Sequence, residues 1–184
     1  MFFLILVSYF TNLFVPHTNE HNIIILLLGI IFFFYLSSKY QKKIKFKYFF
    51  ISYIISLFAI FYFKSHDDFQ FYHFSFIKNI TENKIEFGLG HFNYAFSHVS
   101  SLFYFNSLFK TYFTGHYFYQ IGQLSVMILV NTILLENLFN KSKNSKLNLI
   151  FFVSLFCIFF INIFFYRLAE HGTDRSAQIL FFLC

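Results

Sequence analysis

The stretch IIILLLGIIFFFYLSSKYQKKIKFK, residues 23–47, decides the fold. Its first part, residues 23–36, is an uninterrupted apolar run that, together with its flanks, can cross the hydrocarbon core of a bilayer as a helix. Five lysines follow within residues 39–47, and loops rich in lysine mark the cytoplasmic side of membrane proteins. A further apolar block, residues 48–63, comes next. The pattern predicts two membrane-spanning helices joined by a cytoplasmic loop.

The composition of the whole chain agrees with this interpretation. Of 184 residues, 58% are hydrophobic and 12% are charged, whereas a soluble domain carries about a quarter charged residues. The net charge of +6 comes from lysines in short runs between apolar blocks and not from one basic face, so we expect no nucleic-acid partner. Cys157 and Cys184 form neither a disulfide framework nor a metal motif. The expected partner is the lipid bilayer.

Further apolar blocks complete the predicted architecture, an all-α fold in which one membrane domain, residues 1–184, is a polytopic transmembrane helix bundle. A second lysine loop contains Lys141, Lys143 and Lys146. Another apolar run starts at Ile179, and a sixth span would need more chain, so we expect the N-terminal fragment of a longer protein. The predicted spans cover about residues 2–15, 23–38, 48–63, 120–139 and 147–166.

Placing both lysine loops in the cytoplasm decides the side of every other connection. The N-terminus then lies inside, and residues 16–22, 64–119 and 167–178 lie outside. These three segments contain all eight histidines and seven of the eight acidic residues. Since the lysine rule does not concern acids or histidines, their concentration on one side is a separate observation that indicates an external polar site.

The long external loop, residues 64–119, mixes polar and aromatic residues and contains no clean span. Ser65 followed by Asp68 resembles a helix start, and the aromatic residues after it predict an amphipathic helix along the membrane interface. Gly88 and Gly90 indicate a turn. Residues 93–113 then form a re-entrant or interfacial segment, and we expect the aromatic stripe over residues 92–119 to serve packing and anchoring.

Two clusters of polar residues could carry chemistry. The first is Asp67 and Asp68 with Tyr72 and His73, and the second is the run Glu170-His171-Gly172-Thr173-Asp174-Arg175. Carboxylates at these places could act as a general base or hold a divalent cation, the one cofactor that the sequence suggests. The Arg175 guanidinium could bind a phosphate directly.

Structural explanations stand beside these chemical ones. The aspartates suit the first turn of a helix, and Thr173 could cap the helix that begins near Asp174, with Gly172 supplying a turn. Gly88-Leu89-Gly90 lacks the strand and helix of a dinucleotide loop, and Asn79-Ile80-Thr81 is too short a glycosylation motif to interpret. Four histidines outside the clusters are expected to be interfacial polar residues: His17, His21, His98 and His116.

Three groups of residues together resemble a family of uncharacterised bacterial polytopic membrane proteins that is similar to the GT-C class of glycosyltransferases. They are Asp67-Asp68 with Tyr72-His73, then Gly88-Leu89-Gly90-His91-Phe92-Asn93 with Ser97 and Ser100, and finally the run from Glu170 to Arg175. The resemblance covers about residues 48–184. It implies a multi-pass protein of the bacterial inner (plasma) membrane with a cytoplasmic N-terminus.

The resemblance also implies an activity, the use of a polyprenyl-phosphate-linked sugar in cell-envelope glycan synthesis, with an essential aspartate in the first large external loop. Asp67 or Asp68 matches that position, and Asp174 would be the third catalytic residue. The class usually places this loop after its first helix, whereas two spans precede the matching helix here, which is a departure from the pattern of the class. The substrate-binding residues expected on this basis are Tyr72, His73, His91, Glu170, His171 and Arg175.

Two alternatives stay open. A polysaccharide flippase or polymerase-like transporter component would use the same polar groups to line a substrate path. It predicts polar residues inside the spans, where Asn131, Asn148, Ser154 and Asn162 qualify without a charge pair. A non-catalytic membrane fragment is the second alternative.

Overall fold

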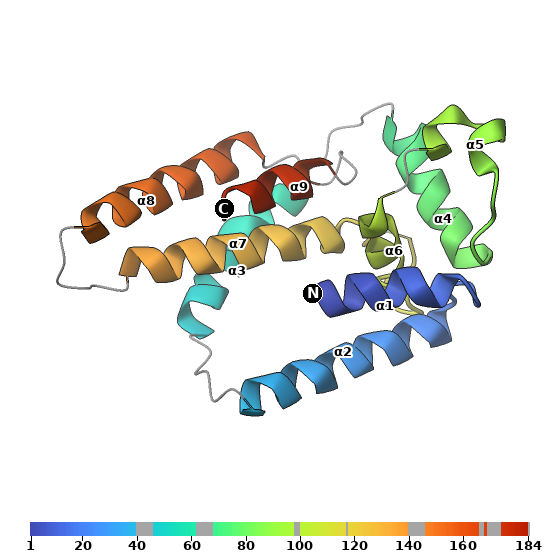
Figure 1. Cartoon of the computed structure of the whole chain (residues 1–184), viewed down its shortest axis with the longest axis horizontal. Helices are drawn as coiled ribbons and strands as arrows, with labels where there is room; N and C mark the ends of the chain where they lie inside the picture. The colour runs from blue at the N-terminus through green and yellow to red at the C-terminus, as the bar shows by residue number, and fades with distance from the viewer. Residues whose placement is uncertain are drawn as a thin grey trace. The chain divides into compact units, whose positions relative to one another are not determined.

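The computed structural model describes residues 1–39, 46–61, 68–97, 100–116, 118–139, 146–165, 168 and 174–183, which are helical apart from turns and short connections (Figure 1). No strand forms within these ranges, which confirms the predicted all-α class. The chain divides into two compact units, and its organisation as one membrane domain stays a prediction. Unit 1 comprises Met1–Ile44 with Ser65–Gly122, and unit 2 comprises Lys45–Lys64 with Gln123–Cys184.

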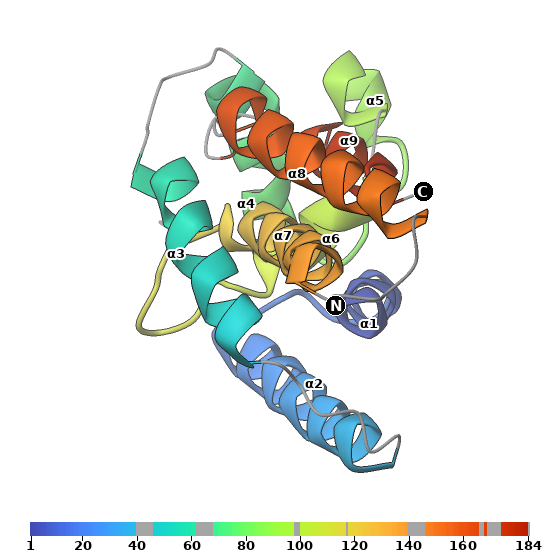
Figure 2. The same ribbon diagram turned by 90° about the vertical axis from the view of Figure 1, so that its left-hand side faces the viewer.

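Unit 1 begins with two helices, α1 (Phe2–Asn12) and α2 (Asn19–Lys39), which lie side by side (Figures 1 and 2). α1 ends three residues before the end of the predicted span, at Asn12, whose side-chain amide donates to the backbone carbonyl of Ile80 at 3.2 Å. Pro16, which has no backbone N–H, follows. α2 starts earlier than predicted because Thr18 Oγ1 accepts a hydrogen bond from the His21 N–H, at 3.4 Å.

Among the described residues, two helices are long and apolar enough to cross a membrane by length and composition. They are α2 and α7 (Ile121–Phe139), of which the first two residues belong to unit 1. At 1.5 Å per residue, the 21 residues of α2 extend about 32 Å, which matches a hydrocarbon core of about 30 Å. Apolar residues on several faces of α2 are exposed, and only Asn22 and Ile25 are buried along it. In α7, by contrast, 56% of the apolar stretch is buried within the protein.

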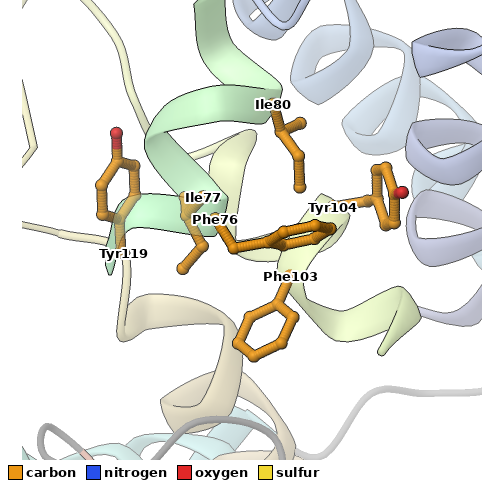
Figure 3. Close-up of a cluster of buried hydrophobic side chains, with 6 residues drawn as sticks. All are labelled: Phe76, Ile77, Ile80, Phe103, Tyr104 and Tyr119. Atoms are coloured by element: carbon orange, nitrogen blue, oxygen red, sulfur yellow. The ribbon is translucent and has the colours of Figure 1, made fainter. Parts of the chain in front are cut away.

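The predicted external loop folds into short helices within unit 1. They are a π-helical turn η1 (Phe69–His73), α4 (Phe74–Glu82), α5 (Leu89–Phe92), the 3-10 turn η2 (Tyr94–Ser97) and α6 (Ser101–Ser107). α6 packs against both α1 and α4. The side chains between them form the core of the unit (Figure 3): Phe76, Ile77, Ile80, Phe103, Tyr104 and Tyr119.

This core changes the role expected for one residue of the predicted aromatic helix, whose interfacial position stays a prediction. Phe76, one of the residues expected at the membrane interface, is 3% exposed and packs between α4 and α6, whereas Phe71 is 66% exposed. Asp68 precedes η1, as predicted for a helix start, but its side chain makes no capping hydrogen bond. Ser65 lies outside the described residues. The apolar face of α4 is buried because it packs against the aromatic side chains of α6.

Unit 2 contains α3 (Phe46–Phe61), most of α7, α8 (Lys146–Phe164) and α9 (Asp174–Phe181). The starts of α7 and α8 confirm the predicted blocks to within one residue. Asn131 of α7 donates to Ser56 Oγ of α3 and to Asn162 Oδ1 of α8, each at 3.2 Å. Asn162 donates back to Asn131 Oδ1 at 3.1 Å. Polar side chains therefore hold three apolar helices together.

Candidate functional site

Unit 1 contains a cavity of about 450 Å³ where α1 ends. Its walls come from α1, α4, Tyr104 of α6 and the segment from Lys84 to Ser97. The apolar part of the lining includes Phe76, Ile80, Ile85, Leu89 and Phe96. The polar part includes Asn79, Lys84, Glu86, His91 and Ser97. A cavity that combines an apolar lining with a few polar groups is the usual form of a small-molecule site.

Asn12 joins the elements around this cavity. Its side-chain amide lies 3.2 Å from the backbone carbonyl of Ile80 and 3.3 Å from the backbone carbonyl of Asn83. The backbone carbonyl of Asn12 accepts a hydrogen bond from the Ile85 N–H at 2.9 Å. The residue is 1% exposed, so these bonds form away from water, where a lost partner is expensive. The end of α1, the end of α4 and the following turn are therefore held together.

Two glycines shape the opposite wall. Gly88 caps α5 with φ of 88°, a left-handed conformation that favours glycine. At Gly90, an added Cβ would lie 3.1 Å from Ser97 Cβ, so the absence of a side chain lets α5 approach η2. Sequence reasoning gave Gly88-Leu89-Gly90 no dinucleotide-binding role, and it missed that these residues form a cavity wall. The signal was the pair of glycines beside a histidine.

The charged groups of the cavity come from the turn after α4 and from α5. The Asn79 amide donates to Glu86 Oε2 at 3.2 Å, and its Oδ1 accepts from the Asn83 amide at 2.7 Å, which orients the Glu86 carboxylate. Lys84 and His91 also line the cavity with exposed side chains. An ammonium, an imidazole and a carboxylate above an apolar lining can bind a ligand that has both charged and apolar parts.

Tyr104 forms the wall nearest α1, and its ring meets that of Tyr9 edge to face with centroids 5.0 Å apart. Burial, with a smaller contribution from Tyr9, raises the pKa of Tyr104 to about 12. Its hydroxyl therefore stays protonated at neutral pH. In Figure 3, the hydroxyl groups of Tyr104 and Tyr119 point away from each other, on opposite sides of the core.

A second polar group in unit 1 is the buried His17. Its Nδ1 lies 2.6 Å from Ser107 Oγ and its Nε2 lies 3.0 Å from the Ser8 carbonyl. Because a carbonyl only accepts, Nε2 carries the proton of the neutral imidazole. The Ser107 hydroxyl lies 2.6 Å from both Nδ1 and the Tyr104 carbonyl, and its one proton can be donated to either of them. The Asn22 amide donates to the carbonyls of Ser107 and Lys110, each at 2.8 Å. This network ties the connection between α1 and α2 to the end of α6.

The interpretation of His17 as an interfacial residue is therefore wrong, since its side chain is 0% exposed. Burial first, and then the neighbouring His21, lower the pKa of His17 to about 3, with a partial opposing effect of the hydrogen bond to Ser8. His17 is neutral at physiological pH. The signal that sequence reasoning missed was the set of polar residues in and beside the first predicted span: Ser8, Asn12 and Asn22.

The first predicted cluster is only partly described. Asp67 lies outside the described residues, and Asp68 is exposed. Tyr72 packs edge to face on Phe103, with centroids 5.5 Å apart, and the His73 ring lies at the same distance from Phe103. Of the predicted site residues that the structure describes, His91 lines the cavity, whereas Asp68, Tyr72 and His73 do not.

The second predicted cluster belongs to unit 2. Asp174 begins α9, as predicted, and the Arg175 guanidinium lies 5.3 Å from the centroid of the Phe165 ring. Glu170, His171 and the side chain of Asp174 lie outside what the structure describes. Within the described part of the chain, no three His, Cys, Asp or Glu side chains gather as metal ligands. A shared site of Asp68 and Asp174, and its divalent cation, stay predictions.

Comparison with known proteins identifies one family. Residues 1–184 match the family described as "Domain of unknown function (DUF8201)". No curated protein and no solved structure matches the chain.

Proposed function

The chain belongs to this family, the domain of unknown function DUF8201, and we propose that it is a polytopic membrane protein that holds the headgroup of a lipid-linked sugar in the cavity of unit 1. The observation that carries the proposal is the combination of Lys84, Glu86 and His91 with an apolar lining, at the end of an apolar helix. The proposal has two parts, the bilayer as surroundings and the cavity as binding site.

The bilayer is supported by the surface of α2. Phe34 is 62% exposed, Phe33 51% and Leu28 48%, and at about 100° per residue these three residues lie on different sides of the helix. A helix that is apolar all round needs either a protein core or lipid around it. Since unit 1 buries only two residues of α2, lipid is the surrounding that fits. We extend the membrane assignment to α1, α3, α7 and α8, with the lysine loops in the cytoplasm.

The cavity suits a phosphate attached to a lipid. The Lys84 ammonium and the His91 imidazole can donate hydrogen bonds to phosphate oxygens. The Glu86 carboxylate can accept hydrogen bonds from sugar hydroxyls, and the Asn79 amide can donate to them. Phe76, Ile80 and Phe96 offer an apolar surface to the first part of a polyprenyl chain. With the N-terminus in the cytoplasm, the end of α1 lies on the external side, where the predicted polar site belongs.

We further propose that the activity is GT-C-like transfer of the sugar to a cell-envelope glycan, with Asp67 or Asp68 as base or metal ligand and Asp174 with Arg175 at the phosphate. A transporter would instead need polar groups that are free to line a path through the spans. Asn131, Asn162 and Ser56 bind one another, so this observation favours a structural role for them. Asp68→Ala and Asp174→Ala should each reduce surface glycan in cells, and unchanged glycan with both variants would refute transfer.

Binding is tested directly with the purified chain in mild detergent and a short-chain polyprenyl monophosphate, by titration calorimetry. Lys84→Gln should weaken binding by about tenfold or more, because a hydrogen bond to a charged group contributes about 1.5–3 kcal/mol. Lys78→Gln is the matched control, since Lys78 pairs with Glu82 at 3.8 Å, and Lys78 does not line the cavity.

Two further ligands separate the sources of affinity. The matching polyprenol tests whether the phosphate matters, and inorganic phosphate tests whether the lipid does. We expect the monophosphate to bind more tightly than either. Equal affinity for the polyprenol, or equal losses with Lys84→Gln and Lys78→Gln, would refute a phosphate site in this cavity.

A further inference from the structure

Three aromatic side chains in and beside the segment that lines the cavity are highly exposed. Phe92 is 92% exposed, Phe87 89% and Tyr94 77%. Phe87 also lines the cavity, and the segment between Phe87 and Phe92 supplies four more lining residues. We call Phe87, Phe92 and Tyr94 the aromatic rim. Exposed apolar side chains that gather in one place mark sites of contact with a partner or a membrane.

The backbone under the rim is held by hydrogen bonds. The His91 N–H donates to the Gly88 carbonyl at 2.9 Å, and the Asn93 N–H donates to the Leu89 carbonyl at 3.1 Å. The Asn93 side chain accepts from the Ala95 N–H at 3.0 Å. Leu89 and Phe96, in the same segment, point inward and pack against the core of unit 1. The outward direction of the rim is therefore a property of the fold.

We propose that the aromatic rim inserts into the headgroup region of the bilayer, so that a lipid-linked ligand enters the cavity from the membrane and not from water. The inference rests on the proposed function, because it names the route to the same cavity. Phenylalanine and tyrosine at protein surfaces favour the membrane–water boundary, where an apolar ring and a polar tip are both accommodated.

The surface around the mouth supports the bilayer as partner. Tyr9, which is 44% exposed, lines the cavity with Phe87, and Phe10 next to it on α1 is 59% exposed. The cavity that Phe87 lines is thus also bordered by an exposed aromatic surface of α1. Lys84 and His91 lie at the same mouth, where cationic side chains would meet anionic headgroups.

A second copy of the chain is the competing partner, and the size of the rim argues against it. Three aromatic side chains can bury about 600 Å² together, at roughly 200 Å² each. A stable protein interface buries about 800 Å² on each partner. Insertion into lipid needs no such minimum, because each ring partitions independently.

The test uses the fact that the chain contains no tryptophan, so one introduced tryptophan is a unique fluorophore. Phe92→Trp reports on the rim in the full chain reconstituted in phosphatidylcholine–phosphatidylglycerol vesicles. Phe33→Trp, on the exposed apolar surface of α2, is the positive control, and Glu82→Trp, on the polar face of α4, is the negative control. Lipids brominated at shallow or deep acyl positions quench a tryptophan according to its depth.

We expect shallow brominated lipid to quench Phe92→Trp at least about twofold more than it quenches Glu82→Trp, and deep brominated lipid to quench it less than Phe33→Trp. Quenching no stronger than that of Glu82→Trp overturns the proposal. A blue-shifted emission that resists quenching and depends on protein density would assign the rim to a second copy, which also overturns it.

The quenching experiment and the binding experiment of the proposed function can fail separately. Quenching requires no ligand, whereas the calorimetric titration in detergent requires no bilayer. Loss of quenching with intact polyprenyl-phosphate binding refutes the rim alone, and intact quenching without ligand binding refutes the cavity assignment alone.

Discussion

Acidification should destabilise this protein through one residue, His17. The pKa of His17 is about 3 in the folded chain, against an ordinary value of 6.5, because burial and the stacked ring of His21 disfavour the charged imidazolium. Between these two pH values the unfolded chain binds a proton that the folded chain does not bind. The contribution of neutral His17 to folding stability is therefore fully present above pH 6.5 and is lost progressively as the pH falls toward 3.

The size of the effect follows from the pKa difference. At pH 4.5, about two pH units below the ordinary pKa, the cost is about 2.7 kcal/mol, since each unit corresponds to about 1.36 kcal/mol. A domain with a free energy of unfolding of about 5–15 kcal/mol would lose a large part of it. Protonation would place a positive charge at a buried position where the two hydrogen-bond partners of the ring, the Ser107 hydroxyl and the Ser8 carbonyl, are neutral.

The assay is denaturant-induced unfolding in mild detergent at pH 7.5 and 4.5, followed by tyrosine circular dichroism. His17→Gln should be less stable at pH 7.5, because Ser8 and Ser107 lose their partner, and it should show about 2.7 kcal/mol less pH dependence. His91→Gln, at an exposed histidine, should keep the pH dependence of the unmodified chain. An identical pH dependence in the unmodified chain and in His17→Gln would refute the reasoning.

Two substitutions probe the packing. Asn131→Ala and Asn162→Ala, combined in a double-mutant cycle of unfolding in detergent, should show a coupling of about 0.6–1.7 kcal/mol, the range of hydrogen bonds between membrane helices. Thr132→Val is the control because Thr132 bonds only to Ile128 of its own helix. Zero coupling between the Asn131 and Asn162 substitutions would contradict a stabilising hydrogen bond between these two residues. Gly122→Ala should destabilise by about 1–3 kcal/mol, since overpacking a filled core has that cost. Its Cβ would lie 1.8 Å from Oδ1 of the buried Asn106. Gly29→Ala, which meets only Leu4 side-chain atoms, should be tolerated better, and equal melting temperatures of the two variants would contradict the close approach.

The long apolar helices were the most predictable part of the fold. A run of apolar residues as long as a bilayer is thick specifies a helix almost by itself, because neither water nor a neighbouring strand is needed to satisfy its backbone. Helix boundaries were less predictable where a side chain forms a hydrogen bond with a residue far away along the chain, as Asn12 does with Ile80.

The aromatic stripe shows the limit of composition. Sequence reasoning gave residues 92–119 a packing and anchoring role, and the structure confirms packing for Phe103 and Tyr104, which are at most 2% exposed. Phe92 and Phe113, from the same stripe, are 92% and 95% exposed. No local pattern separates these two groups, because the direction of each ring depends on where α1 and α4 pack.

The sequence by itself determined that the chain is helical, that its longest helices are apolar all round, and that its acids and histidines avoid the lysine loops. These properties are local, since each depends on residue type and spacing along one segment. Only the tertiary structure decided that His91 belongs to a cavity, that His17 is buried, and that Asn12 closes the end of α1. The reason is physical: the bonds concerned join residues 68 and 90 positions apart, and chain spacing carries no information about such pairs.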